Sequence, residues 1–275
     1  MPPWRDIFRS EPIVITAPAF EPLSRAEAKL HCKIDSDVTE DDPWIDRNIP
    51  AARRQVEHDL NYTLVRTTYD LLFDRYPSER WMPMPLPPLV SIDGVFSTDE
   101  DGVETAMTST DYYADTAAKP GRLILKPNKS WPSDLRDFQA GRVRYTAGYS
   151  AAPKSVSTLT QTSGTATATC AAHGFSTGQR ITLAGANQDA YNGTFRVTVP
   201  DANSFTFPVV GSPTTPATGT IQAVNLGVSE RHVAAIALLL AHWYENREAI
   251  NVGNIVNEYQ FGYDALISDR LRSLG

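Results

Sequence analysis

Few side chains of this 275-residue sequence have the types and spacing that catalysis or metal binding requires. The histidines are scattered along the chain, whereas a metal site needs several ligands to converge on one point. They are His31, His58, His173, His232 and His242. The last two are ten residues apart, which is about 1000° of rotation on a helix and leaves them roughly 80° away from a common face. We therefore interpret the histidines as core or surface residues.

The cysteines and the known catalytic motifs offer no alternative chemistry. Cys32 and Cys170 lie in neither a CxxC nor a Cys/His spacing, so we expect no zinc site, redox site or disulfide framework. The sequence has no GxGxxG, GxxxxGK(S/T), HExxH or GxSxG motif and no Asx-rich calcium loop. We accordingly predict no catalytic residue, no cofactor and no metal, and a protein that is not an enzyme.

Two charged pairs allow more than one interpretation. Asp41 and Asp42, which follow Glu40, could hold a metal or act as an acid pair, but acids at a helix N-terminus are also stabilised by the helix dipole. Arg53 and Arg54 could contact phosphate, or they could lie on a solvated helix face or form an ion pair between subunits. We favour the structural interpretation of both pairs.

Two aromatic pairs are candidates for buried contacts. Trp243-Tyr244 suits either the core or an interface between subunits, because buried aromatic residues dominate the energetics of protein contacts. Tyr112-Tyr113 falls at the start of an expected strand, where successive side chains point to opposite faces. We expect one ring of this second pair to be buried and the other to be exposed.

The composition is that of a soluble globular protein with an acidic surface. Hydrophobic residues make up 41% of the chain and charged residues 21%, the formal charge is −7 and the pI is about 5.3. A protein that grips nucleic acid usually carries a basic face. An acidic surface would repel DNA, which suits a conduit through which DNA slides.

Neither the start of the sequence nor its longest apolar run suggests a targeting signal or a membrane span. The start, MPPWRDIFRS, lacks the charged and apolar parts of a secretory signal. The longest apolar run, residues 234–241, is far below the roughly 20 residues of a membrane span. We expect synthesis in the cytoplasm and no contact with a membrane.

The elements that must position these side chains begin with two helices. Ser24 and Glu27 have the spacing of a capping box, which predicts a short helix over about residues 25–33. A second helix should begin near Asp42, and its apolar residues recur at steps of three and four. They are Ile45, Ile49, Ala52, Val56 and Leu60. Pro50 should kink this helix or mark a break.

Short strands are expected from Thr63 to Tyr149, where turn signals separate β-compatible runs. The candidate strands are residues 65–74, 89–97, 103–107, 121–125 and 142–147. A hairpin turn is predicted at 99–102, which ends in glycine. The proline-rich stretch 82–88 should be an extended connector outside any central strand.

A change in composition marks a second β region. From about Ser155 to Val224 the chain is rich in Thr, Ser, Ala and Gly and almost free of charge. Helix then returns after Ser229, with an apolar segment at 234–241 that needs the N-terminal helices to complete a core. We therefore predict an all-β module, residues 155–224, inserted into a main domain of residues 1–154 and 225–275.

Seven short segments have an order and spacing that are informative as a set. They are EPLSRAEAKLH (21–31), AARRQVE (51–57), PPLVS (87–91), DYY (111–113), PGRL (120–123), VRYTAGY (143–149) and AHWYENRE (241–248). Together they resemble the gp6-like head-to-tail connectors (adaptors) of tailed bacteriophages. The 155–224 module is the departure, since most similar proteins run directly into the apolar helix.

The resemblance implies an α+β fold, with a helical connector domain that carries a β-rich portion, plus the inserted all-β domain. It implies a virion structural protein at the head–tail interface. About twelve copies would form a ring below the portal protein and extend the DNA channel, and the genomic DNA would pass without specific binding. The ring would dock a head-closure or tail-terminator protein on its other side.

The same resemblance suggests which residues meet the partners. The segment 258–274 would reach the portal and would be disordered before assembly, since an amphipathic tail alone has little to bury against. Its candidate docking residues are Tyr259, Phe261, Tyr263, Leu266, Ile267 and Leu271. A closed ring needs two different complementary faces on each subunit. The candidate core or subunit-interface residues are Trp243, Tyr244, Arg53 and Arg54.

Two other functions remain open from the sequence. The aromatic residues Tyr191, Phe195 and Phe207 could form a sugar-binding platform on an adhesive β module, although alternating aromatics in a strand are more often core. A hydrolase that uses a pair of acids is the second alternative, and no spacing of carboxylates recommends it.

Overall fold

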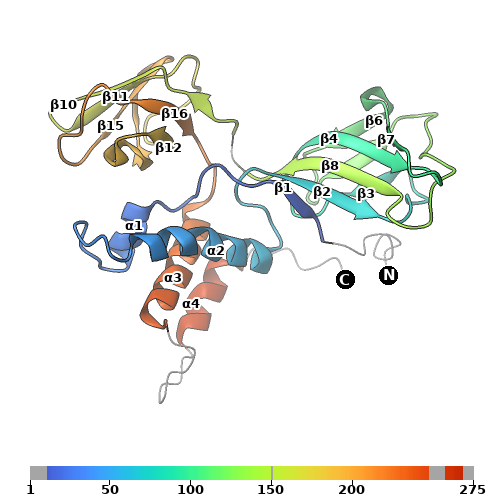
Figure 1. Ribbon diagram of the computed structural model, residues 1–275, viewed down its shortest axis with the longest axis horizontal. Helices are drawn as coiled ribbons and strands as arrows, with labels where there is room; N and C mark the ends of the chain where they lie inside the picture. The colour runs from blue at the N-terminus through green and yellow to red at the C-terminus, as the bar shows by residue number, and fades with distance from the viewer. Residues whose placement is uncertain (1–10, 150, 248–257, 269–275) are drawn as a thin grey trace. The chain divides into compact units, whose positions relative to one another are not determined.

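The computed structural model describes residues 11–149, 151–247 and 258–268, and the chain forms two compact units (Figure 1). The first contains the described residues of 11–19 and 57–149, and the second those within 20–56 and 151–268. This part of the chain contains four antiparallel sheets and is only about 22% helical. The predicted α+β fold with a helical connector domain is therefore wrong. The strands between residues 63 and 149 are no appendage of a helical core, because they close a core of their own.

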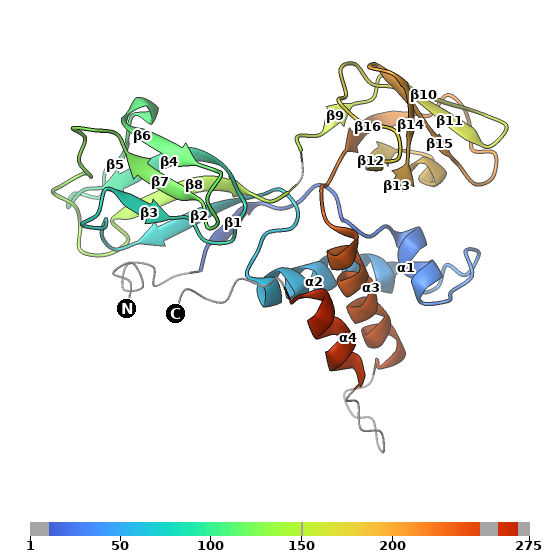
Figure 2. The same cartoon turned by 180° about the vertical axis from the view of Figure 1, so that it is seen from behind.

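The first unit is a sandwich of two antiparallel sheets, and Figure 2 displays the strands of both. Its strands are β1 (Ile13–Thr16), β2 (Thr67–Phe73), β3 (Trp81–Pro83), β4 (Leu89–Thr98), β5 (Glu104–Ala106), β6 (Tyr112–Asp115), β7 (Arg122–Leu125) and β8 (Gly141–Ala147). One sheet has the order β1-β2-β8-β4-β5 and the other the order β3-β7-β6. A 3-10 turn, Ser109–Asp111, precedes β6.

The core of the first unit lies between these two sheets. Alternate residues of the central strand β8 are buried, as the period of a strand requires. Its Tyr145 is fully buried and stacks on Tyr69 of β2, with ring centroids 5.5 Å apart. The second sheet contributes Met82, Tyr112 and Leu123 to the same core. Tyr112 is buried and Tyr113 is 53% exposed, which confirms the predicted in-and-out pair.

Turns and edges account for the remaining differences in this unit. The predicted hairpin turn is confirmed, because β4 and β5 pair across it and Gly102 has a φ of +83°. The proline-rich stretch is in part a strand, since Met82 and Pro83 belong to β3. This strand is at the edge of its sheet, where a missing N–H donor is tolerated. β1 was not predicted from the sequence.

The second unit contains the other two sheets. Its strands are β9 (Lys154–Ser155), β10 (Thr158–Thr162), β11 (Thr165–Thr169), β12 (Arg180–Ala186), β13 (Gly193–Arg196), β14 (Thr198–Asp201), β15 (Ser204–Pro208) and β16 (Gly219–Val224), with a 3-10 turn at Asp189–Tyr191. The sheet orders are β10-β11-β15-β14 and β13-β12-β16-β9. Their shared core is drawn from residues 156–223. The boundaries 155–224, and the division of the chain into a module and a main domain, stay predictions.

Four helices of the described chain belong wholly or mainly to the second unit: α1 (Arg25–His31), α2 (Asp42–Leu60), α3 (Glu230–Glu245) and α4 (Glu258–Leu266). The capping box at Ser24 and Glu27 is confirmed, and α1 follows it directly. The predicted apolar stripe of α2 is buried along its whole length. Pro50 lies inside α2 without ending it.

Candidate functional site

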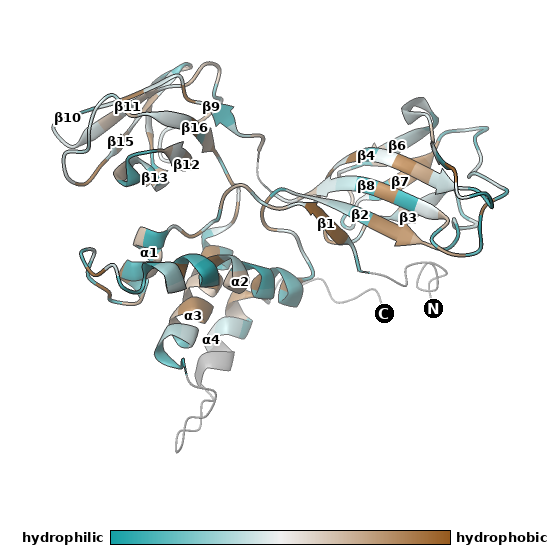
Figure 3. Ribbon diagram, viewed as in Figure 1, coloured by the Kyte–Doolittle hydropathy of each residue, from teal (hydrophilic) through white to brown (hydrophobic). Residues whose placement is uncertain are grey.

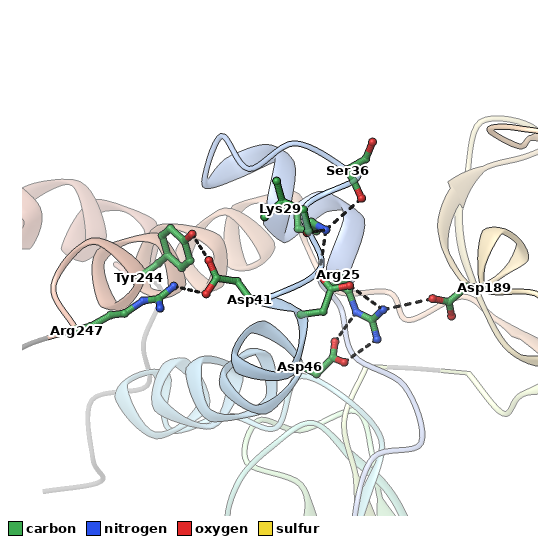
Figure 4. Close-up of polar contacts among 10 residues, drawn as sticks. Arg25, Lys29, Ser36, Asp41, Asp46, Asp189, Tyr244 and Arg247 are labelled. Atoms are coloured by element: carbon green, nitrogen blue, oxygen red, sulfur yellow. Dashed lines mark hydrogen bonds and ion pairs between the residues drawn. The ribbon is translucent and has the colours of Figure 1, made fainter.

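The acid pair Asp41-Asp42, which the sequence singled out, lies where α1, α2 and α3 converge, and Figure 4 shows the contacts of Asp41. The Asp41 carboxylate, just before α2, accepts a hydrogen bond of 2.6 Å from the Tyr244 hydroxyl and one of 2.8 Å from Arg247 Nη2. The Arg247 guanidinium also lies over the rings of Tyr244 and Trp44. The Tyr244 hydroxyl and then Arg247 hold the pKa of Asp41 below its usual value. Asp41 is therefore an ionised hub that ties the start of α2 to the end of α3.

The second acid of the pair holds a buried lysine. Lys29 is 6% exposed, and its ammonium donates to Asp42 Oδ1 at 2.9 Å, to the Ser36 carbonyl at 3.2 Å and to the Val38 carbonyl. Three acceptors match the three donors of a lysine. The group fixes the loop between α1 and α2.

A third cation extends the network to the β strands of the same unit. Arg25 binds both oxygens of Asp46, at 2.7 and 2.6 Å, and its Nη1 lies 3.3 Å from Asp189. The hydrogen bond to Asp46 is the main cause of the raised pKa of Arg25. Arg180 of β12 similarly donates to Glu27 and, at 2.7 Å, to Glu230, the first residue of α3.

Both acids of the Asp41-Asp42 pair are engaged with cations of the same chain. Asp41 and Asp42 each hold a cation, and Asp41 also provides the backbone carbonyl that accepts the first amide bonds of α2. No group of three or more potential ligands is placed to hold a metal among the described residues. The interpretation of this acid pair as structural is thus the one that the geometry supports.

His173 and the two cysteines are likewise accounted for by packing. His173 is buried, its Nδ1 accepts from the Phe175 amide, and its Nε2 lies 3.2 Å from the carbonyls of Asp201 and Ser204. Cys32 and Cys170 are free thiols, and burial raises the pKa of both.

The residues predicted as core or interface have mixed environments. Arg53 is buried, and it binds Glu21 through Nε at 2.7 Å and Nη2 at 3.2 Å, so this ion pair forms within one chain. Arg54 is exposed and donates to the Pro50 carbonyl. Trp243 and Tyr244 are half-buried. A role of these residues in subunit contacts stays a prediction.

The predicted portal-docking residues fall in α4, which lies beside α3 (Figures 1 and 2), and in the segment after it. Tyr263 and Ile267 are buried within the chain, and Leu266 is half-buried. The side chains of Tyr259 and Phe261, and all of Leu271, lie outside the described residues. Residues 258–266 are helical in the isolated chain, whereas we expected this segment to be unstructured before assembly.

The candidate sugar platform is not a surface. Tyr191 is fully buried, Phe207 is 2% exposed, and Phe195 packs against the same core with its ring 4.5 Å from that of Phe207. The three aromatic residues therefore hold the two β sheets together.

Sequence reasoning missed one charged cluster, on the outer face of the five-stranded sheet. Asp70 of β2 binds Arg144 of β8 through two hydrogen bonds of 2.8 Å, and Arg142 bridges Asp70 to Glu104. The alternation of Arg142, Val143, Arg144 and Tyr145 was the available signal, because it places both guanidinium groups on one face.

A hollow of about 700 Å³ in the first unit is lined by residues 74–77 and 131–137. Its two large rings, Tyr76 and Trp131, stack on each other at 4.9 Å, and the Trp131 indole donates to the Glu79 carbonyl. Burial raises the pKa of Tyr76, which keeps its hydroxyl protonated as a donor to the Phe96 carbonyl. Ser133, which lines the hollow, donates its hydroxyl to the carboxylate of the adjacent Asp134 at 3.0 Å, and no histidine or cysteine is among the residues that line it.

Comparison with known proteins gives a likeness of fold. No protein-family model and no curated protein matches the chain. Similar solved chains occur in the neck of an empty GTA particle computed with C6 symmetry (17% identity, TM-score 0.54), in the virion of a native gene transfer agent (GTA) particle (15%, 0.56) and in the neck of a native GTA particle computed with C12 symmetry (16%, 0.54). Each comparison covers 97% of this chain and 98% of the other.

No described helix is both long and apolar enough to cross a bilayer.

Proposed function

We propose that this protein is a structural component of the neck of a phage-like particle, where it forms the ring that connects head to tail. The observation that carries the proposal is the likeness of fold over nearly the whole chain to neck proteins of GTA particles. The acid pairs engaged with cations and the core positions of the aromatic residues favour this function over a hydrolase or a sugar-binding module.

In this proposal the protein is a connector of the gp6-like kind. A ring of about twelve copies lies below the portal protein, continues the DNA channel and receives a head-closure or tail-terminator protein on its far side. The net charge of −7 suits a channel wall that does not retain DNA. The protein has no enzymatic role in this scheme and resides in the virion.

The portal contact is the finer part of the proposal. The segment from Glu258 onward is the proposed docking element, but Tyr263 and Ile267 are buried in the free chain. If these two side chains bind the portal, α4 must first leave its position. Docking through the residues that follow Ile267 needs no such movement.

Loss of the protein from the producing cell tests the function. Without a connector, heads should package DNA but remain unjoined to tails, and electron micrographs should contain both parts separately. A variant that lacks residues 269–275 should reproduce this defect if that end reaches the portal. Normal particles in the absence of the protein would contradict the proposal.

A further inference from the structure

One edge of the five-stranded sheet is an apolar strand. β1 has the sequence Ile-Val-Ile-Thr, and in the described chain its sole strand neighbour is β2. Ile13, Val14 and Ile15 are 48%, 53% and 45% exposed, and Figure 3 shows β1 as strongly hydrophobic. An edge strand offers unpaired N–H and C=O groups, and natural proteins usually guard such an edge with charges. β1 contains no charge.

The opposite edge of the same sheet is formed by β5, whose three residues are all exposed. The Met107 amide donates to the Val95 carbonyl at 2.8 Å, and the Val103 carbonyl accepts from the Asp99 amide at 3.1 Å. These residues on either side of β5 therefore turn their backbone groups toward β4. Because the direction alternates along a strand, the N–H and C=O groups of Glu104 and Ala106 point away from the sheet.

The same alternation fixes the free groups of β1. The Thr98 amide of β4 donates to the Ala140 carbonyl, so Ala140 and the even-numbered residues of β8 direct their backbone groups to β4. The odd-numbered residues of β8 therefore direct theirs to β2 on the other side. On β2, Asp70 then faces β1, where its partner is Ile13. Val14, the next residue, is left with its N–H and C=O groups directed away from the sheet.

The two edges match in direction as well as in free groups. All neighbours in the order β1-β2-β8-β4-β5 are antiparallel, so β1 and β5, four steps apart, run the same way. Rotation about a ring axis along the strands preserves this direction. An edge contact between successive copies would therefore be a parallel strand pair. In such a pair, the N–H and C=O groups of one residue bond to two different residues of the adjacent strand.

We propose that β1 of one copy pairs in parallel with β5 of the next, so that the five-stranded sheets join into a continuous belt around the ring. Val14 then lies beside Thr105, its N–H donates to the Glu104 carbonyl, and its C=O accepts from the Ala106 amide. Directly paired residues of neighbouring strands have their side chains on the same face of a sheet. Val14 pairs with Tyr69 and Thr105 pairs with Ser97, and both partners are on the face that packs against the core, so Val14 and Thr105 share that face. This inference rests on the proposed ring.

The width of the sheet agrees with a ring around DNA. Five strands span about 24 Å at the usual spacing. Across the sheet, Val14 lies in register with Tyr145 of β8, whereas Thr105 lies in register with Gly141, four residues earlier on the same strand. If Val14 of one copy lies beside Thr105 of the next, this offset makes the strands tilt from the ring axis by about 30°, near the tilt of closed barrels. Twelve copies would then close a belt about 100 Å across, and six copies one about 50 Å across. Either belt can surround a DNA duplex.

Crosslinking in the assembled ring tests this contact. Val14→Cys and Thr105→Cys are combined with Cys32→Ser and Cys170→Ala, and the protein, mixed with the portal of its particle, is treated with a short bis-maleimide. We expect a ladder of covalent oligomers on a denaturing gel that extends to the ring number. Either single cysteine variant, or Val14→Cys with the exposed Val210→Cys, should give no ladder.

The outcomes separate this contact from the ring itself. A ring of full mass without a ladder overturns the β1–β5 contact and leaves the proposed function intact. Covalent dimers from Val14→Cys alone show a two-fold β1–β1 contact, which also overturns it. A protein that stays monomeric with the portal overturns both proposals. As a second measurement, Val14→Pro removes the outward donor, and we expect it to lower the ring fraction at least tenfold while circular dichroism stays unchanged.

Discussion

Replacement of Asp70 by asparagine tests the ion-pair network on the outer face of the first unit. The Asp70 side chain is 8% exposed and binds Arg144 through both oxygens at 2.8 Å, with Arg142 at 3.3 Å. The hydrogen bond from Arg144 is the main reason why the pKa of Asp70 lies below its usual value. Asp70→Asn keeps the shape of the side chain and removes its charge.

The change in the free energy of unfolding depends on which contacts Arg142 and Arg144 keep once the Asp70 charge is removed. A hydrogen bond to a charged group contributes about 1.5–3 kcal/mol, and breaking a fully buried pair costs about 3–5 kcal/mol. Arg144 is 39% exposed and can be hydrated, and Arg142 keeps its contact with Glu104 at 2.7 Å. We therefore expect the free energy of unfolding to fall by about 2 kcal/mol, near the lower end of these ranges.

Urea unfolding followed by circular dichroism measures this change, and Asp115→Asn is the matched control. Asp115 binds a single arginine, Arg122, through two hydrogen bonds, and its side chain is 24% exposed against 8% for Asp70, so its loss should be smaller. The pH dependence gives a second readout. Because the folded pKa of Asp70 is lowered, its contribution is present above the unfolded pKa of about 3.9 and is lost as the pH falls through the folded value. Equal losses for the two variants, or a difference between wild type and Asp70→Asn that is unchanged at pH 3, would refute the reasoning.

Three further predictions concern packing. Gly148→Ala should lower the free energy of unfolding by about 2 kcal/mol or more, because φ is +121° and a Cβ would lie 2.6 Å from backbone nitrogen, whereas Gly102→Ala, with φ of +83° and open space, should cost about 1 kcal/mol in thermal melts. Tyr191→Ala should destabilise the protein by about 3–5 kcal/mol, because Tyr191 is fully buried. A glycan array should detect no sugar binding by either the wild type or this variant. Cys170 should react with a thiol reagent only after unfolding, whereas the half-buried Cys32 should react slowly in the native protein; rapid native labelling of Cys170 would contradict its burial.

Local patterns predicted those elements whose determinants lie close together in the chain. The capping box at Ser24 and Glu27 located α1, and the stripe from Ile45 to Leu60 identified both α2 and its buried face. The pair Tyr112-Tyr113 was assigned correctly because a strand alternates.

The fold class and most of the site depend on contacts across long separations. β1 is four residues long and exposed on both faces, and its partner β2 begins at Thr67, so no local period marks it as a strand. The partners of Arg25 include Asp189, which is 164 residues away. Helices can be predicted from the local period of their apolar residues, whereas the pairing of short strands into a sandwich depends on residues far apart in the sequence.

The mass of the assembled protein tests the central claim most directly. Native mass spectrometry of the purified chain, alone and mixed with the portal ring of the same particle, counts the subunits that join. We expect a complex of about twelve copies that forms with the portal. A chain that remains a monomer at all concentrations and ignores the portal would contradict its function as a connector ring.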